Sequence, residues 1–502
     1  MMERKSETRE FKSGFTWRSY LAILYAIFIY TPAVIWLSLV TVGIRLVVPI
    51  TLSTLILFVE FARISGKPLS KHESFIIMSL TGQATGIIFT NLIYRLFFVH
   101  SDIAEYFKIA DKVPYWWAPP RSSSVWIFRT FLHADWIIPI TIALLANILS
   151  IISGLSLGLF ARELFIEKEG LPFPMQQVHA RAVITLTERE EESMNIFAVT
   201  TIIGFIYGLI LYAIPFVSEA MGVPGRFIPI PWFDFWYYVQ RFFPGASFGI
   251  GTDILLIVSG LVLPFPVVLG MFIGSFFIYF IANWLLVHFG WTLWATRYTP
   301  GMNIRMILRE STLSWLAMPL IGIGIAAGLL PIFLRARDFS SAVRSMFQSK
   351  IDESEVRISG ARFSIRLALL FFFASAAGAT VLLWVLIPDA PIWFFLPLIV
   401  IWPIIDTLIS VRMIGVTGVG FDIPYLTQMA IYSSGYKGYD LWFAPIIITE
   451  GTQWCVNFKM CQLTETSIIS YLKAWVLTMP LSIIVSFISV SVFWNIAPIP
   501  SA

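Results

Sequence analysis

The stretch "WIIPITIALLANILSIISGLSLGLF", from Trp136 to Phe160, is apolar almost without interruption. A helix that crosses the hydrocarbon core of a bilayer needs about 20 mostly apolar residues, so this stretch is long enough to span a membrane. A second apolar run begins at Met194. Between the two lies "EKEGLPFPMQQVHARAVITLTEREEES" (167–193), with two prolines, two glutamines and a histidine. The sequence therefore predicts two membrane-spanning helices joined by an irregular, polar connection.

The composition extends this prediction to the whole chain. Of the 502 residues, 58% are hydrophobic and only 13% are charged, whereas a soluble domain carries about 25% charged residues. Backbone polar groups in lipid must be satisfied within the protein, so long apolar runs indicate helices, and the alternating pattern of a membrane barrel is absent. We therefore expect an all-α, polytopic membrane protein with about 12–16 transmembrane helices. The clear candidate spans lie near 20–43, 46–61, 74–98, 135–160, 195–217, 247–263, 265–289, 312–334, 366–387, 391–410, 441–458 and 472–496.

The basic residues predict the orientation. The net charge is +4, and most Lys and Arg residues lie in short loops, where they indicate orientation rather than nucleic-acid binding. Cytoplasmic loops carry an excess of Lys and Arg, so we expect a cytoplasmic N-terminus in the cell membrane and an external 99–130 loop. The residues behind this assignment are Arg4, Lys5, Arg9, Lys12 and Arg18 of the tail, Arg63, Lys67 and Lys71, and Arg335, Arg337, Arg344, Lys350, Arg357 and Arg362.

A weak internal repeat links two parts of the chain. "RELFIEKEGLPFPMQQ", from Arg162, and "RMIGVTGVGFDIPYLTQ", from Arg412, share residues at an offset of 250 positions. Duplicated segments interrupted by Pro or Gly point to the binding site of a transporter, and two ordinary helix ends are the alternative. We therefore expect two pseudo-symmetric transmembrane halves, 1–250 and 251–502. The matched pairs are Arg162 and Arg412, Gly170 and Gly420, Pro174 and Pro424 and, within one position of register, Gln177 and Gln428.

Four stretches along the chain carry a family resemblance. They are "GKPLSKHESFIIMSLTGQATG" (66–86), "GLPFPMQQVHARAVITL" (170–186), "FGIGTDILLIVSGLVLPFPVVLGMFIGSF" (248–276) and "VNFKMCQLTETSIISYLKAWVLT" (456–478). The second resembles the Leu-Pro-Phe/Tyr-Pro motif of the oligopeptide transporter superfamily, which includes the yellow stripe-like metal-chelate transporters. The other three are similar to further segments of that family, in the same order. The chain departs from the family at Met175–Gln177, where small residues are usual, at Asn457, where Asp is usual, and in its shorter length.

The resemblance implies two halves of about eight spans each, working by alternating access. Members of the family couple the uptake of small peptides or metal–chelate complexes to a cation gradient, usually of protons. The expected partners are accordingly membrane lipid, a small-molecule substrate and a coupling cation, with no nucleic acid. A homo-oligomer remains among the alternatives for the assembly.

The connection "GLPFPMQQ" (170–177) is the predicted substrate site. Prolines interrupt helical hydrogen bonding, and in a bilayer such breaks are tolerated only where protein or a water-filled cavity satisfies the freed groups. We therefore expect an ordered, non-helical elbow that faces a cavity, and a plain cytoplasmic loop is the alternative. The residues predicted to bind substrate are Phe173, Pro174, Gln176 and Gln177, with Gln428 from the second copy of the repeat.

Three acidic residues within apolar segments are the candidates for ion coupling. A charge at the centre of a bilayer costs about 2.5–3.5 kcal/mol on insertion scales, so such residues suggest function. Glu450 lies in "LWFAPIIITEGTQWCVNF", Asp253 follows "FGIG", and Asp406 lies in "FFLPLIVIWPIIDTLIS". Each carboxyl group can take up and release a coupling proton. A structural pairing is the alternative for all three, and for Asp406 it is the favoured interpretation.

Two motifs of phosphate and metal binding are missing from the sequence. It contains no P-loop and no His-Glu-x-x-His, and Cys455 and Cys461 lack a zinc or redox spacing. We expect no enzyme activity, no cofactor and no metal site. Two alternatives stay open, a non-transporting membrane scaffold and a polyprenyl-linked sugar transferase. The transferase would use acidic residues of the 99–130 loop, namely Asp102, Glu105 and Asp111.

Overall fold

The predicted span 136–160 forms α8 (Ala134–Ala161), a 28-residue helix of the computed structural model. The structure describes residues 11–40, 47–84, 90–222, 228–229, 231–334, 364–420, 423 and 425–498. Helix α8 begins after His133, whose ring nitrogen accepts a hydrogen bond from the backbone N–H of Asp135 at 3.3 Å. Beyond this cap its side chains are almost all apolar, and the helix is long enough to cross a bilayer.

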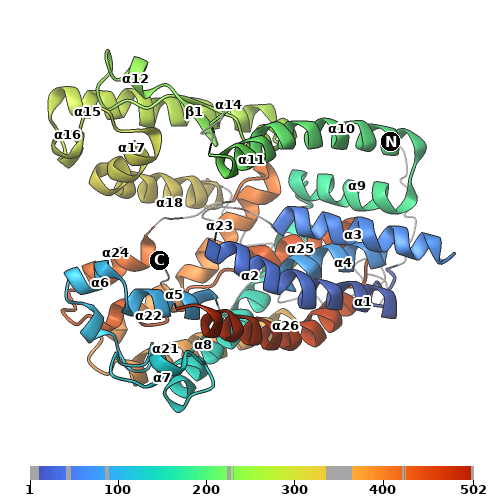
Figure 1. Cartoon of the computed structure of the whole chain (residues 1–502), viewed down its shortest axis with the longest axis horizontal. Helices are drawn as coiled ribbons and strands as arrows, with labels where there is room; N and C mark the ends of the chain where they lie inside the picture. The colour runs from blue at the N-terminus through green and yellow to red at the C-terminus, as the bar shows by residue number, and fades with distance from the viewer. Residues whose placement is uncertain are drawn as a thin grey trace.

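The long helices around α8 form the body of the molecule, which fills the lower part of Figure 1. Helix α21 (Ile365–Leu386) lies against α8. The two helices approach closely at the small residue Ser375, whose hydroxyl donates to the carbonyl of Leu149 at 2.6 Å. The other helices of the body are α1 (Trp17–Tyr25), α2 (Thr31–Val40), α3 (Val47–Ile64), α4 (Lys71–Ala84), α5 (Thr90–Val99), α6 (Asp102–Tyr106), α7 (Val125–Phe128), α9 (Pro174–Glu188), α22 (Ile392–Val400), α23 (Trp402–Thr417), α24 (Leu426–Ser433), α25 (Thr452–Leu463) and α26 (Ile468–Ile496).

Residues 191–334 form a second part, the upper layer of Figure 1. It contains the strands β1 (Trp232–Asp234) and β2 (Gly249–Gly251), which pair antiparallel. The visible division of the molecule therefore does not fall at residue 250, and the predicted pseudo-symmetric halves stay a prediction. The helices of the upper layer are α10 (Glu191–Gly208), α11 (Ile214–Ala220), α12 (Trp236–Val239), α13 (Ile254–Val262), α14 (Phe265–Ser275), α15 (Asn283–Phe289), α16 (Leu293–Arg297), α17 (Ile304–Ser311) and α18 (Ala317–Leu334).

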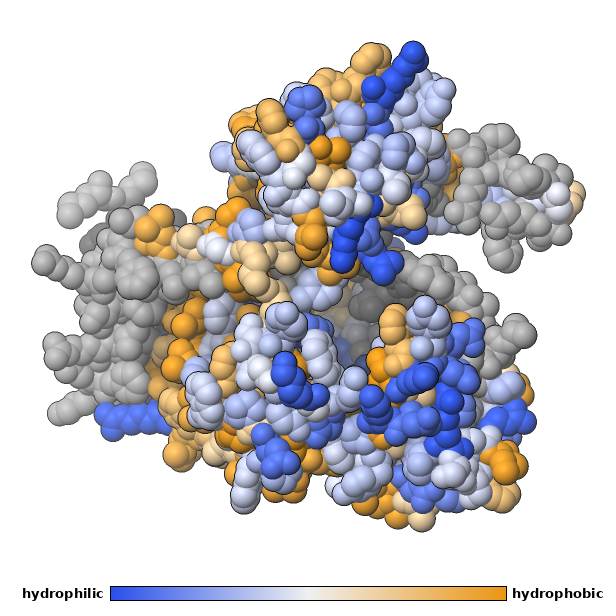
Figure 2. All heavy atoms as spheres, turned by 90° about the vertical axis from the view of Figure 1, so that its left-hand side faces the viewer, coloured by the Kyte–Doolittle hydropathy of each residue, from blue (hydrophilic) through white to orange (hydrophobic). Residues whose placement is uncertain are grey.

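The chain is an all-α helical membrane protein, as its sequence predicts. Many large apolar side chains lie on the surface of both parts, and Figure 2 shows them in orange on one face. The predicted total of about 12–16 spans stays a prediction. Among the described residues, seven helical segments are long and apolar enough to cross a membrane, namely Trp17–Leu37, Ala134–Lys168, Glu191–Ala213, Phe265–Phe289, Ile365–Leu386, Ile392–Thr417 and Ile468–Ile496.

Wide helical turns interrupt several of these spans. Such π-helical turns are rare and often occur at functional sites. The one at the end of α8 leads directly into the predicted elbow. The π-helical turns within the spans are η1 (Ala26–Tyr30), η3 (Arg162–Lys168), η4 (Leu209–Ala213) and η5 (Phe276–Ala282), and a further one, η6 (Thr312–Leu316), precedes α18.

The orientation of the chain remains an expectation. Arg4, Lys5 and Arg9 lie outside the described residues, and so does the basic loop that runs from Arg335 to Arg362. The described part of the chain leaves the cytoplasmic side of the membrane unassigned.

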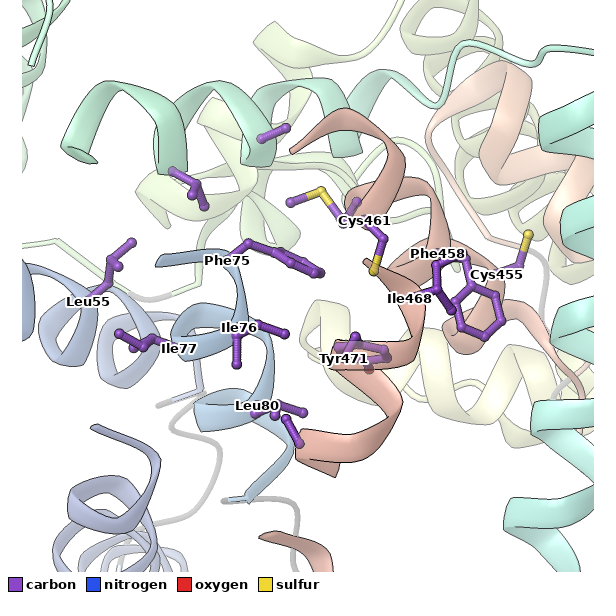
Figure 3. Packing of buried hydrophobic residues seen from close by; sticks show 14 of the residues in the cluster. Leu55, Phe75, Ile76, Ile77, Leu80, Cys455, Phe458, Cys461, Ile468 and Tyr471 are labelled. Carbon is purple, nitrogen blue, oxygen red and sulfur yellow. The ribbon is translucent and has the colours of Figure 1, made fainter. Parts of the chain in front are cut away.

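The main hydrophobic core joins α4, α25 and α26. Figure 3 shows Phe75 and Leu80 of α4 facing Tyr471 of α26, and the ring centroids of Phe75 and Tyr471 lie 6.0 Å apart. Cys455 and Cys461 of α25 are both free thiols buried in this core. The interpretation of these two cysteines as small buried residues is confirmed.

The prediction of one continuous helical span over 441–458 is wrong. Residues 445–450 are non-helical, and α25 begins only at Thr452. Side chains of the neighbouring helices bond to this segment. Ser153 of α8 donates its hydroxyl to the carbonyl of Thr449 at 3.3 Å, and Gly451 donates its N–H to the hydroxyl of Thr407 at 2.9 Å. These contacts satisfy backbone groups that a helix would otherwise pair internally.

Small residues on one face of α8 allow this segment to approach closely. Ser150, Gly154 and Gly158 recur every four positions and therefore share a face of the helix. The hydroxyl groups of Ser150 and Thr449 are 2.6 Å apart. A Cβ atom added to Gly451 would overlap the backbone of α8 at Gly158. Residues 449–451 thus lie directly on the backbone of α8, in the manner of small-residue packing between membrane helices.

This close approach predicts a large effect for Gly451→Ala. The added methyl group overlaps backbone atoms, so we expect the free energy of unfolding to fall by about 1–3 kcal/mol. The midpoint of thermal unfolding of the protein in lipid nanodiscs measures the effect. Gly204→Ala in α10 is the matched control, since no atom lies within 4 Å of its added Cβ. Equal midpoints for Gly451→Ala and the parent would contradict the packing described above.

Candidate functional site

The elbow predicted over 170–177 is non-helical only at 170–173, and the prediction is wrong for 174–177, because Pro174 fits the first position of helix α9. It follows η3, and α9 begins immediately after it at Pro174. Phe173 adopts a left-handed backbone conformation with φ +50°, which is uncommon for a residue with a side chain. Its N–H donates to the carbonyl of Gly415 at 2.8 Å, and its own carbonyl accepts from the N–H groups of Gln176 and Gln177. The elbow is therefore ordered by backbone hydrogen bonds.

The side chains of the elbow face different surroundings. The ring of Phe173 is fully buried in the main core, with the Lys459 ammonium 5.5 Å from its centroid. Gln176 is buried, and its Oε1 has no hydrogen-bond partner among the described residues. Gln177 is exposed and donates to the carbonyl of Pro172 at 2.7 Å. Phe173 thus packs as a core residue, and contact of the elbow with substrate stays a prediction.

The two copies of the repeat are only partly brought together. Arg412 pairs with Glu169 at 3.0 Å, so the start of the second copy lies against the first elbow. Gln428 does not join them, because its helix α24 lies far from α9 in Figure 1. Pro424 lies outside the described residues. Tyr425 precedes α24 in a left-handed conformation, as Phe173 precedes α9.

Two of the three predicted coupling acids lie close in the structure. We term the non-helical residues 445–450 the extended segment. Glu450 is its last residue, and the Glu450 carboxylate accepts from the N–H of Thr452 at 3.1 Å at the start of α25. Asp406 lies on α23 and accepts from the hydroxyl of Ser410 at 3.2 Å. These acids are adjacent in sequence to Gly451 and Thr407, which share a hydrogen bond. An anion at a helix N-terminus is stabilised by the helix dipole, so Glu450 is favourably placed.

Asp253 lies apart from these two acids. It precedes α13 in the upper layer, where its N–H donates to the carbonyl of Pro231 at 3.2 Å. The predicted span 247–263 consists of β2 and the short α13. We term Glu450 and Asp406 the Glu450 cluster. The structure therefore places Asp253 in a different layer from this cluster.

A cavity of about 230 Å³ opens beside the other end of the extended segment. Its lining comes from α5, the loop after α6, α8 and the segment itself at Pro445. We term it the Arg95 cavity, after its one charged lining residue. The other polar lining residues are Asn91 and Asn147, and its aromatic walls are Trp116, Trp117 and Phe443.

A second, larger cavity of about 470 Å³ adjoins the first and shares two of its walls. We term it the aromatic cavity. The rings of Trp117 and Phe443 form the shared wall, with centroids 5.0 Å apart. The full lining is Tyr94, Phe98, Ile109, Trp117, Tyr439, Trp442 and Phe443.

Arg95 is held in place by Trp117. One guanidinium nitrogen donates to the Trp117 carbonyl at 2.9 Å, and the guanidinium carbon lies 5.2 Å from the indole centroid. No carboxylate in the described part of the chain forms an ion pair with it. Sequence reasoning missed this residue. Arg95 lies within the predicted span 74–98, so the criterion that selected Glu450 also applies to it.

The Arg95 cavity and the Glu450 cluster lie along the same two elements. On α8, Asn147 lines the cavity, and Ser150 and Ser153 one to two turns later contact Thr449. On the extended segment, Pro445 lines the cavity and Glu450 ends the segment. The rise of 1.5 Å per residue places Asn147 and Gly154 about 10 Å apart along α8. The Arg95 cavity and Glu450 therefore lie about two helical turns apart along the same two elements.

Comparison with known proteins adds no family assignment. No model of a known protein family matches the chain, and no curated protein sequence matches it significantly. The resemblance to oligopeptide transporters stays an expectation.

The contact between the elbow and α23 predicts a measurable coupling between Arg412 and Glu169. Their side chains are 20% and 28% exposed, so we expect a double-mutant cycle with Arg412→Gln and Glu169→Gln to give about 0.5–1 kcal/mol. The Arg181–Glu190 pair, whose side chains are 64% and 62% exposed, is the control. Unfolding midpoints of single and double variants supply both values. The prediction is wrong if the coupling at Arg412 is no larger than in the control pair.

Proposed function

We propose that the protein is a secondary active transporter that works by alternating access. The observation that carries this proposal is the extended segment 445–450, which lies against the middle of the apolar helix α8. Non-helical backbone at membrane depth is tolerated only inside protein or along a water-filled cavity. Interrupted helices of this kind form the substrate and ion sites of many transporters. Here the segment runs from Pro445, which lines a cavity, to the acidic residue Glu450.

The family resemblance supplies the substrates and the energy source of this proposal. We infer that the protein moves small peptides or metal–chelate complexes across the cell membrane, with its N-terminus in the cytoplasm, and that a proton or another cation drives the movement. Transport is favoured over catalysis because the interrupted backbone at 445–450 lies against the apolar helix α8. The acids of the transferase alternative, Asp102, Glu105 and Asp111, are exposed on the 99–130 loop.

Glu450 is the proposed coupling residue. Its carboxylate lies at the junction of the extended segment and α25, next to the bond between Gly451 and Thr407. A proton bound there neutralises the charge that faces the α25 N-terminus, so protonation alters the contacts that hold this junction. Asp406 is the second candidate, since it neighbours Thr407 on α23. Asp253 precedes α13 in the upper layer, and any role for it is separate.

Glu450→Gln tests the coupling. The variant keeps the size of the side chain and mimics its protonated form, so binding and folding should persist. We expect the ratio of internal to external substrate in proteoliposomes to fall to about one, because an uncoupled carrier only equilibrates its substrate. Uptake of a panel of peptides and metal chelates, with and without a pH gradient, measures this ratio. Glu191→Gln, at an exposed acid of α10, is the matched control.

Two outcomes would count against the proposal. Accumulation by Glu450→Gln with the pH dependence of the parent would exclude Glu450 as the coupling site and direct attention to Asp406. Failure of the parent to take up any compound of the panel, under either condition, would contradict transport of peptides or chelates.

A further inference from the structure

We propose that the Arg95 cavity binds the acidic group of a small organic anion, and that the aromatic cavity beside it holds an apolar part of the same molecule. This inference rests on the proposed function in one respect, because it takes the bound anion to be the transported substrate. The acidic group is a carboxylate or a phosphate, which share the same recognition chemistry at arginine.

The charge of Arg95 is the first argument. A guanidinium within a membrane-spanning body is costly unless a negative group or hydrogen bonds compensate it. In the described part of the chain the guanidinium donates one hydrogen bond, to the Trp117 carbonyl, a neutral acceptor. A guanidinium carries five N–H donors in a planar fork, so most of them are left for a ligand in the cavity. A bound anion would supply the missing negative charge.

The polar neighbours of Arg95 favour the same ligand. Asn91 lies one helical turn before Arg95 on α5, and Asn147 faces the cavity from α8. Each amide offers two N–H donors. Among the described residues that line the two cavities, none is acidic. The polar lining is therefore rich in donors and carries a positive charge, which suits an anion and opposes a cation.

The aromatic walls select an apolar group. Trp117 and Phe443 line both cavities, and Phe98 packs edge-on against both rings at 5.7 Å. Ligand sites are commonly apolar clefts of about 300–1,000 Å³ with a few placed polar groups. The aromatic cavity of about 470 Å³ lies in this range, and the Arg95 cavity of about 230 Å³ supplies the polar end. A molecule with one acidic group and one ring or aliphatic chain fits both.

Equilibrium binding to the full-length protein in lipid nanodiscs tests this site. The probes are N-acetylphenylalanine and its uncharged amide, a pair that differs only in the acidic group, measured by calorimetry at constant salt and pH. We expect the acid to bind at least about tenfold more tightly than the amide, a factor typical of one charge-assisted contact. Phenyl phosphate as a third probe distinguishes the two acidic groups, and tight binding of either acid supports the site.

Variants locate the charge that is responsible. Arg95→Gln should remove the preference for the acid, and Arg121→Gln should retain it, because Arg121 is a nearby arginine that does not line either cavity. Arg95→Lys keeps the charge without the planar fork and should give an intermediate preference. If Arg95→Gln fails to fold, Arg95→Lys and the thermal stabilisation of the parent by acid against amide still decide the question.

The proposal is overturned by equal binding of acid and amide to the parent, by no binding of either acid up to about 10 mM, or by an unchanged acid preference in Arg95→Gln. These outcomes are separate from those of the transport assay. Acid binding at Arg95 without uptake would leave the site intact and contradict transport. Uptake without acid preference would leave transport intact and contradict the site.

Discussion

The contact of residues 449–451 with the backbone of α8 is the constraint on which the rest of the body depends. A chain that leaves the helical conformation within a membrane must find partners for its N–H and C=O groups. Ser153 and Thr407 provide them from two different helices. The absence of a side chain at Gly158 and Gly451 lets the backbones approach closely enough for these bonds to form. Hydroxyl groups, one donating and one accepting, and missing Cβ atoms therefore act together.

This contact brings together four elements, namely α8, the extended segment, α23 and α25. The extended segment carries Pro445 to the Arg95 cavity, and α25 continues from Glu450 to Lys459, whose ammonium lies over the ring of Phe173. Helix α23 supplies Thr407 at the junction and, two turns later, Gly415, which binds the elbow through its carbonyl. A change at the Glu450 junction thus has two direct routes to the elbow at Phe173, along α25 and along α23.

Composition and apolar runs were enough to predict the fold class. The prolines at 172 and 174 predicted the break at 170–173 but not its end, because a proline is also well suited to the first turn of a helix and α9 begins at Pro174. The failure at 441–458 has a physical cause. A short run of isoleucines suits a helix and an extended chain equally well, and periodicity cannot separate the two. Hydrogen bonds to Ser153 and Thr407, which are distant in sequence, stabilise the non-helical conformation of this segment. For the same reason, sequence reasoning did not separate Asp253 from Glu450, or Gln428 from the elbow, because both groupings depend on how the helices pack.

The burial of both cysteines has a practical consequence. Thiols react as thiolates, and a thiol enclosed in an apolar core is inert. Cys455 and Cys461 are fully enclosed by the core around α25, so the native chain offers a silent background to thiol reagents. Fluorescent or paramagnetic reporters can be attached at single introduced cysteines without first removing the native ones. Distances between the upper layer and the body then become measurable in a bilayer during turnover, in a chain whose own sulfur chemistry is left unaltered.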